Sequence, residues 1–241
     1  MKTRKGSAGA TFLNQDIQKL RPGILFFLLA ALSASPLWAG PWMLDAGQGF
    51  VSASATIRQS EADQWRHEFS YFGEYGLSDQ LTLGLDLNQN DRASGHALLF
   101  ARVPLVRRRS ALALALTVSA GGAHDQGAWN GLYRVTLSSG YSYETKNGSG
   151  WTSVDATYEL RSALEGATWK LDGTLGWNSP GALSPMLQIE TSKTAGKPLS
   201  YAIIPSLRYR VSDHQEVVLG LEYKEADQRS LGLKVALWHR F

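Results

Sequence analysis

The sequence predicts an all-β membrane protein: a transmembrane, antiparallel, up-and-down β-barrel of twelve strands, with ten as the fallback count. Three observations predict this fold. Apolar and polar residues alternate along almost the whole chain after residue 48. Aromatic residues recur in pairs eight positions apart on several of the alternating segments. The last of these segments runs to the final residue, Phe241.

Alternation identifies the strands because successive side chains of a β-strand point to opposite faces. In the segment LTLGLDL, residues Leu81, Leu83, Leu85 and Leu87 share one face. Most segments approach the roughly 9–11 residues that a tilted strand needs to cross a bilayer. The pattern is weakest in two of them, 96–104 and 151–160, which is why ten strands is the fallback. The predicted strands are 49–58, 65–76, 81–89, 96–104, 111–120, 130–143, 151–160, 167–177, 184–191, 200–211, 216–224 and 230–241.

The connections between the predicted strands are short, so none of them is expected to fold into the barrel as a large plug. An even strand count places both chain ends on one side of the membrane. The segment AHDQG puts His124 and Asp125 in a predicted outer loop, 121–129. Pro205 lies in the middle of a predicted strand, where it removes a ladder hydrogen bond that a local bulge could absorb.

The aromatic pairs distinguish a membrane barrel from a soluble β-sandwich or a lipocalin-like barrel. Eight residues at about 3.3 Å each span roughly 26 Å of strand. A tilt near 40° makes this about 20 Å of height, close to the ~25 Å apolar band that aromatic girdles bound in outer-membrane barrels. A soluble core has no reason to hold aromatic residues at two heights. The predicted girdle pairs are Tyr133 and Tyr141, Trp169 and Trp177, and Tyr201 and Tyr209.

Residues 1–39 have the parts of a secretory signal peptide, and 40–241 would form the barrel. A basic stretch precedes the apolar run GILFFLLAAL, which is too short to span a bilayer as a helix. Cleavage is expected after Ala39. The leader holds five Lys or Arg and one Asp, which leaves 19 basic and 20 acidic residues in the remainder. The basic pI of about 9.1 therefore belongs to the leader, and no nucleic-acid partner is expected.

The final strand resembles the C-terminal signature of bacterial outer-membrane β-barrels. Its apolar face holds Leu231, Leu233, Val235, Leu237, His239 and Phe241. The resemblance implies an outer-membrane location in a Gram-negative bacterium, with outer-membrane lipid, the barrel-assembly machinery and periplasmic chaperones as partners. It also implies that Leu237, His239 and Phe241 form the assembly signal, although His239 departs from the usual apolar or aromatic residue.

The hairpin FGEYGLSDQLTLGLDL (72–87) is similar to hairpins of small proteobacterial outer-membrane proteins. These include the putative transporters linked to the meta-pathway of phenol degradation. This second resemblance covers only one hairpin of the chain.

If the apolar residues face lipid, the residues of opposite parity line the barrel. Charges there are expected to face water or one another, because a midplane Arg or Lys facing lipid costs roughly 2–4 kcal/mol. The predicted cations are Arg58, Arg66, Arg102, Arg134, Lys170, Arg208, Arg210, Lys224, Lys234 and Arg240. The predicted anions are Glu68, Glu74, Asp86, Asp155, Glu159, Asp172, Glu190 and Glu222.

Two functions follow from this lining. In the first, the barrel is a small passive, porin-like channel for small polar or anionic solutes. In the second, the charges pair and close a structural or surface-interaction barrel. Arg208 and Arg210 are the expected anion-attracting spot, and the alternative for them is pairing with Glu222 or Glu190.

A lipid-acting outer-membrane hydrolase is the third hypothesis, and we expect no enzyme activity and no catalytic residue. His67 and His239 are expected near the rims and His214 in a turn, which leaves His96 as the candidate base to test. No cofactor is expected. The chain has no cysteine, which excludes disulfides and thiolate metal sites, and no His, Asp or Glu cluster has the spacing of metal ligands.

Overall fold

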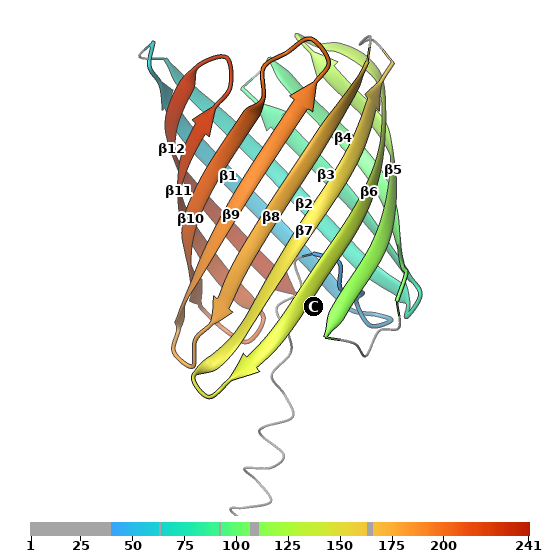
Figure 1. Cartoon of the computed structure of the whole chain (residues 1–241), viewed down its shortest axis with the longest axis vertical. Helices are drawn as coiled ribbons and strands as arrows, with labels where there is room; N and C mark the ends of the chain where they lie inside the picture. Colours follow the sequence, from blue (N-terminus) through green and yellow to red (C-terminus); the bar gives the residue numbers. More distant parts are fainter. Residues whose placement is uncertain (1–39, 63, 92, 107–110, 163–165) are drawn as a thin grey trace, which may run out of the picture. The chain divides into compact units, whose positions relative to one another are not determined.

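The computed structural model describes residues 40–62, 64–91, 93–106, 111–162 and 166–241, so the predicted signal peptide lies outside the described residues. The described chain forms twelve β-strands, drawn in Figure 1. The strands are β1 (Gly49–Ser60), β2 (Trp65–Ser78), β3 (Leu81–Asn90), β4 (Ser94–Pro104), β5 (Leu112–Asp125), β6 (Ala128–Thr145), β7 (Gly148–Arg161), β8 (Ala167–Asn178), β9 (Leu183–Thr194), β10 (Ser200–Arg210), β11 (Gln215–Glu225) and β12 (Arg229–Arg240).

The strands close into one antiparallel barrel in which each strand pairs with its neighbours in sequence and β12 pairs with β1. The closing register places Phe50 opposite Arg240 and Ile57 opposite Leu233. Phe241 completes this seam, because its N–H donates to the carbonyl of Gly49 and its carbonyl accepts from the N–H of Gly49. The predicted fold and the count of twelve are confirmed. Among the described residues, no helix is long and apolar enough to cross a bilayer.

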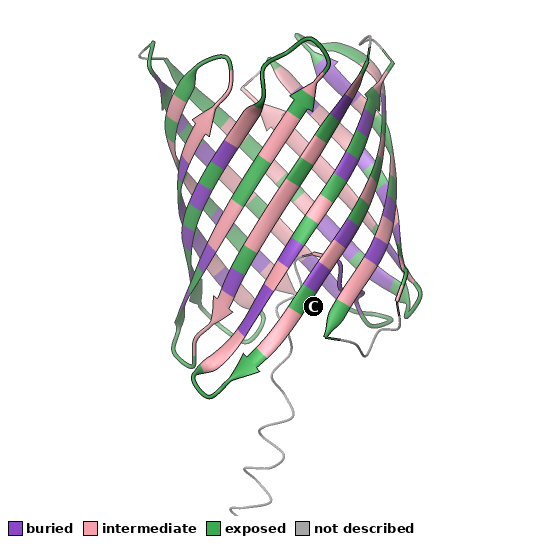
Figure 2. Cartoon of the chain, in the orientation of Figure 1, coloured by how far each residue is buried: buried purple, intermediate pink, exposed green. Residues whose placement is uncertain are grey.

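Exposed and buried residues alternate along the strands, as Figure 2 shows. The outward residues are largely apolar and exposed, for example Val118, Leu171 and Leu221. The inward residues include Ser, Thr and charged side chains, many of them buried. This polarity is inverted relative to a soluble barrel, and it is the arrangement that lipid outside and a wet interior require.

The predicted outer loop 121–129 is wrong. Strand β5 continues to Asp125 and strand β6 begins at Ala128, so only Gln126 and Gly127 join them. Both turn residues have positive φ, 49° and 87°, as in the tight two-residue hairpin turn whose twist matches the strands. His124 packs on Trp129 across the hairpin, with ring centroids 4.9 Å apart. The sequence hid these strand ends because glycine and alanine at 120–123 show no alternation.

Pro205 sits within β10 without a bulge. The pairs Ile203–Tyr223 and Ser206–Gly220 share one register, so no extra residue is inserted between β10 and β11. The two pairs between them are lacking from this ladder, whereas Pro205 still pairs with Leu187 of β9. The expected bulge is replaced by a local gap in one ladder.

The described residues ahead of β1, which are 40–48, lie at the lower end of the barrel, the end where β1 begins and β12 finishes (Figure 1). Pro41, Trp42, Met43 and Leu44 are all buried. The expectation of no large plug concerned the connections between strands, and it did not cover this segment, which lies ahead of the first strand.

Candidate functional site

The barrel encloses a cavity of about 510 Å³, lined by Gly40 and by side chains from eleven strands. Its lining holds six Lys or Arg and six Asp or Glu, so it has no net sign from these groups. The lining changes along the barrel axis from charged, to hydroxyl-bearing, to aromatic. The residues nearest the upper ends of their strands include Arg58, Glu68, His96, Lys170, Glu190 and Lys224. The middle holds Ser54, Ser70, Ser119, Thr136, Thr174 and Gln188.

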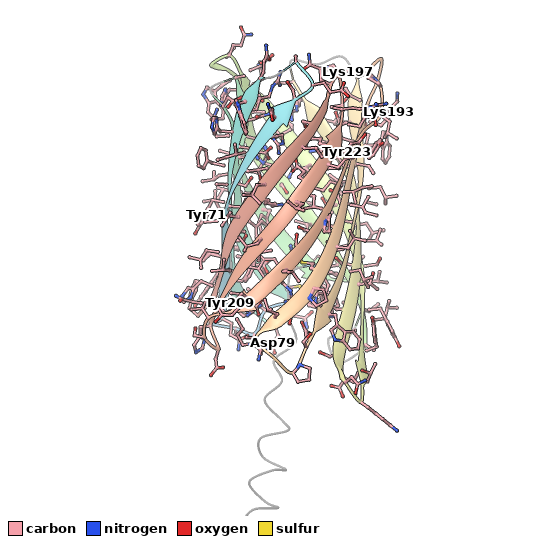
Figure 3. All side chains as sticks on the ribbon, turned by 90° about the vertical axis from the view of Figure 1, so that its left-hand side faces the viewer. Tyr71, Asp79, Lys193, Lys197, Tyr209 and Tyr223 are labelled. Atoms are coloured by element: carbon pink, nitrogen blue, oxygen red, sulfur yellow. The ribbon has the colours of Figure 1, made fainter. Side chains whose placement is uncertain are left out.

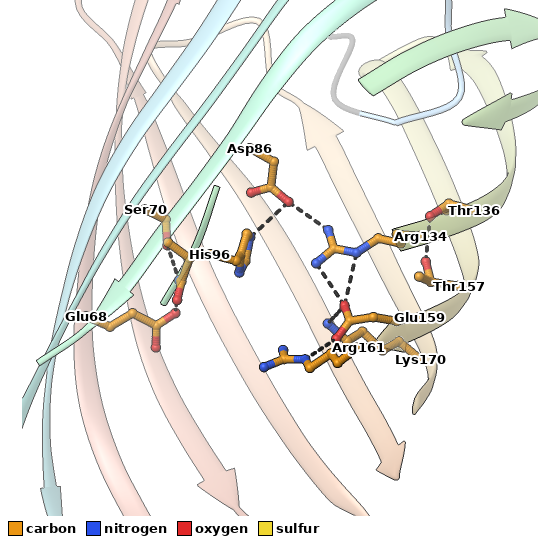
Figure 4. A network of polar contacts seen from close by, with 11 residues as sticks. Glu68, Ser70, Asp86, His96, Arg134, Thr136, Thr157, Glu159, Arg161 and Lys170 are labelled. Carbon is orange, nitrogen blue, oxygen red and sulfur yellow. Dashed lines mark hydrogen bonds and ion pairs between the residues drawn. The ribbon is translucent and has the colours of Figure 1, made fainter. Parts of the chain in front are cut away.

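A charged network crosses the cavity from β3 to β8 (Figure 4). Arg134 on β6 donates from Nη1 to Asp86 Oδ2 on β3 at 2.7 Å, and from Nη2 to Glu159 Oε2 on β7 at 3.0 Å. Glu159 also accepts from Lys170 Nζ at 2.9 Å and from Arg161 Nε at 3.0 Å. One buried carboxylate is therefore shared by three cations, which fixes their positions on the cavity wall.

Arg58 joins three strands at the seam where the barrel closes. Its guanidinium donates to Glu68 on β2 at 2.6 Å and to Glu222 on β11. It reaches Glu222 across β12. Gly232 of β12 pairs with Arg58 on one side and with Glu222 on the other. A Cβ at Gly232 would stand 3.2 Å from the Arg58 Cβ, so glycine keeps this crossing open.

Some charges face the cavity with weaker partners. Within the described chain, Asp155, Asp172 and Lys224 form no ion pair, and Lys234 Nζ lies 3.9 Å from Glu190 Oε1. Asp155 and Asp172 lie directly opposite each other on β7 and β8. Asp172 accepts a hydrogen bond from the N–H of Thr191 at 2.9 Å, which bridges a gap in the β8–β9 ladder. These residues offer charge to a solute that enters.

The lower part of the cavity is aromatic. Phe72 and Phe100 stack with ring centroids 5.3 Å apart, and Phe50 meets Trp238 edge-on at 5.9 Å. Trp151 also lines the cavity. The sequence indicated these residues only by their inward parity, and our prediction of a charged lumen did not include an aromatic floor.

All of the predicted lumen residues line this cavity except six, which are Arg66, Glu74, Glu159, Arg208, Arg210 and Arg240. Arg66 and Arg210 are exposed near strand ends. Glu74 is buried in the wall, where it accepts from Arg102 at 2.7 Å. Parity gives the side of the wall on which a residue lies, but it does not say whether the side chain reaches water or a neighbour.

The expected anion-attracting spot at Arg208 and Arg210 is wrong. Arg208 is buried and donates to Glu216 Oε2 at 3.2 Å, to the Trp177 carbonyl at 2.9 Å and to Asn178 Oδ1 at 2.7 Å. These last two groups lie where the β8–β9 ladder ends, beside Pro185, which has no N–H to donate. Arg208 therefore completes the wall. The alternative partners, Glu222 and Glu190, are wrong as well.

The predicted girdle residues all have outward parity, and Tyr133, Tyr141, Trp169 and Tyr209 are among the exposed large side chains. They extend into groups with aromatics that the sequence reading did not include. Figure 3 shows Tyr209 toward the lower end, where Asp79 lies, and Tyr223 toward the end that holds Lys193 and Lys197. The groups are Tyr141, Tyr143 and Trp177 toward the lower end, and Tyr158 with Trp169 and Tyr201 with Tyr223 toward the upper end.

The histidines do not form a catalytic arrangement that the structure describes. His96 lines the cavity, with Nε2 3.2 Å from Asp86 Oδ2, but Asp86 is also held by Arg134. His124, on the outward face, has its Nε2 atom 2.9 Å from Gln89 Oε1. The described residues contain no group of three or more His, Asp or Glu that could hold a metal ion.

Comparison with known proteins identifies a fold and no family. No family model matches the chain, and no curated protein does. The KdgM porin superposes with a TM-score of 0.60 at 11% identity, over 79% of this chain and 99% of that one. The NanC porin superposes with a TM-score of 0.59 at 7% identity, over 78% of this chain and 98% of that one. An outer-membrane channel from Pseudomonas putida F1 gives 0.55 at 11% identity, over 85% and 100%.

The chain has the fold of small outer-membrane porins. At these identities the similarity shows the fold alone. The resemblance of residues 72–87 to the meta-pathway transporters finds no support, since no family model matches. The KdgM porin has also been solved in complex with disordered oligogalacturonate, and that structure gives a TM-score of 0.59.

Proposed function

We propose that this protein is a small passive channel in the outer membrane of a Gram-negative bacterium, for small polar or anionic solutes. The cavity carries this proposal, because about 510 Å³ of space inside a closed barrel is lined by charges of both signs. Charged walls replace part of the hydration of an entering solute and set its preferred sign. The lower end, which holds Phe241, would face the periplasm.

A closed barrel with a structural or surface-interaction role is the second candidate, and two observations favour it. Ion pairs cross the cavity, as between Arg134 and Asp86, and residues 41–44 fill the lower end. Planar-bilayer recording separates the two candidates. A channel should give discrete conductance steps and should swell liposomes in small sugars or organic anions. Silence in both assays would contradict the channel.

Ion selectivity should depend on Asp155 and Asp172, which lack an ion-pair partner in the described chain. A charge about 8 Å from a passing ion is worth roughly 0.5 kcal/mol in water. Each removed charge favours the anion and disfavours the cation, so the double variant Asp155→Asn/Asp172→Asn should raise the anion-to-cation permeability ratio by roughly thirtyfold. Reversal potentials in a salt gradient measure this ratio. Asp213→Asn, in an exposed turn, is the matched control and should leave it unchanged.

We also propose that Leu237, His239 and Phe241 are read by the barrel-assembly machinery, with periplasmic chaperones carrying the chain to it. The exposed side chains of Leu237 and Phe241 support this reading, since they are available outside the barrel wall. Removal of Phe241 should lower the amount of assembled barrel in cells. Refolding of the same variant into detergent separates loss of the signal from loss of the seam with Gly49.

A further inference from the structure

The segment ahead of β1 crosses the lower end of the lumen from one wall to another. At one end it is tied to β2, where Gly47 N–H donates to the Gly76 carbonyl at 2.8 Å and Gly76 N–H donates to the Gln48 carbonyl at 2.9 Å. At the other end Trp42 meets Trp151 of β7 edge-on, with ring centroids 6.1 Å apart. Between these contacts Pro41, Met43 and Leu44 are buried, so the segment occupies space that a solute would otherwise cross.

Two inward glycines of the wall make room for this segment. A Cβ at Gly140 of β6 would stand 2.6 Å from Pro41 Cγ and 2.8 Å from the Trp42 ring. A Cβ at Gly76 would stand 2.3 Å from the Asp45 carbonyl oxygen and 3.1 Å from Leu44 Cβ. Real side chains essentially never approach this closely, so the barrel wall is shaped to receive the segment in this position.

The first residues of the segment are seated by packing. In the described chain Pro41 and Trp42 take part in no hydrogen bond, and β1 begins only at Gly49. Gly47 lies between the buried residues 41–44 and the start of β1. It has a φ of 87°, and a Cβ there would meet nothing within 4 Å. Rotation at this glycine breaks its own hydrogen bond to the Gly76 carbonyl, but it can carry residues 40–44 out of the lumen without breaking a strand pair.

We propose that residues 40–44 are a movable plug, hinged at Gly47, that closes the periplasmic end of the channel and must leave before solute can pass. This inference rests on the proposed channel function. It assigns the aromatic floor a role as well, because Trp151 holds the plug residue Trp42 in the closed state. The open state would join the cavity, which reaches Gly40, to the periplasm.

Two variants test the plug in planar bilayers. Deletion of residues 40–44 should raise the mean conductance several-fold over the unmodified protein. The second variant is Gly40→Cys/Ser153→Cys, in a chain that has no cysteine of its own. A Cβ at Gly40 stands 3.2 Å from Ser153 Cβ, a little closer than the roughly 3.5–4.5 Å of a disulfide, and the φ of 133° at Gly40 means that its backbone must adjust to carry a cysteine. When oxidised, this variant should conduct less than the unmodified protein, and a reductant should restore its current.

The matched control is Trp129→Ala, which removes an exposed tryptophan at the opposite end of the barrel. It should leave the conductance unchanged. Heat-modifiable migration on gels shows that each variant is a folded barrel. Equal conductance of the deleted and unmodified proteins overturns the plug and leaves the channel standing. If neither the deleted nor the unmodified protein conducts, the channel proposal is overturned, and the plug proposal with it.

Discussion

Replacing Arg58 with methionine should lower the free energy of unfolding by about 3–5 kcal/mol, the cost of leaving a buried charge without its partner. Glu222 is buried, with a side chain 5% exposed, and Arg58 is its ion-pair partner. Glu68 would lose the same guanidinium, although its carboxylate still accepts from Asn88 Nδ2 at 2.7 Å. The lost ion pair joins β1 to β11 across β12, where the first and last strands close the barrel. The variant should therefore weaken the barrel at this closure. Urea titration of the barrel in lipid vesicles measures the change.

Arg229→Met is the matched control for this prediction. Arg229 also joins neighbouring strands, with Nη1 3.9 Å from Glu61 Oε1, but its side chain is 59% exposed and its charge stays in water. Exposed ion pairs contribute little because water solvates both partners and salt screens them. The control should unfold close to the unmodified protein. Equal losses for the two variants would mean that the seam does not depend on the buried pair.

A charge on the outer wall should be far more damaging than the same charge one residue away in the lumen. Val118 and Ser119 are neighbours near the middle of β5; Val118 is exposed on the outer face and Ser119 lines the cavity. Val118→Arg should cost about 2–4 kcal/mol in a bilayer, because the guanidinium would lie in hydrocarbon near the midplane. Ser119→Arg places the same group in the wet cavity and should cost much less.

The comparison needs a lipid bilayer, since it depends on the solvent outside the barrel. Folding into lipid vesicles, followed by heat-modifiable migration and urea titration, measures both variants under one condition. If Ser119→Arg were the more harmful of the two, the assignment of lipid to the outer face would be inverted. A protein with water on its outer wall would tolerate Val118→Arg well.

The strands and their faces were predictable because alternation is a local property of an extended backbone. Leu81 to Leu87 indicate both a strand and the face it turns outward, without reference to any partner. The same rule placed the predicted lumen charges on the inward side, and most of them line the cavity. It failed at 121–129, where glycine and alanine have no side chain large enough to show a period.

Which inward charges meet was not predictable, because that depends on how the strands are staggered around the closed barrel. Arg134 reaches Asp86 three strands away, and Arg58 reaches Glu222 across a glycine on the strand between them. Arg208 was expected to attract anions and instead fills the place beside Pro185 where the ladder lacks a donor. Each of these contacts joins residues that are far apart in the sequence.

The twelve strands, the lipid-facing residues and the closing strand are predictable from the sequence, since each follows from residue spacing along one strand. How open the lumen is depends on contacts between strands, which residue spacing does not show. Residues 41–44 carry no alternation, and nothing in their order shows that the barrel would receive them. They are buried because Gly140, Gly76 and Trp151, from three different strands, converge on one end of the closed wall.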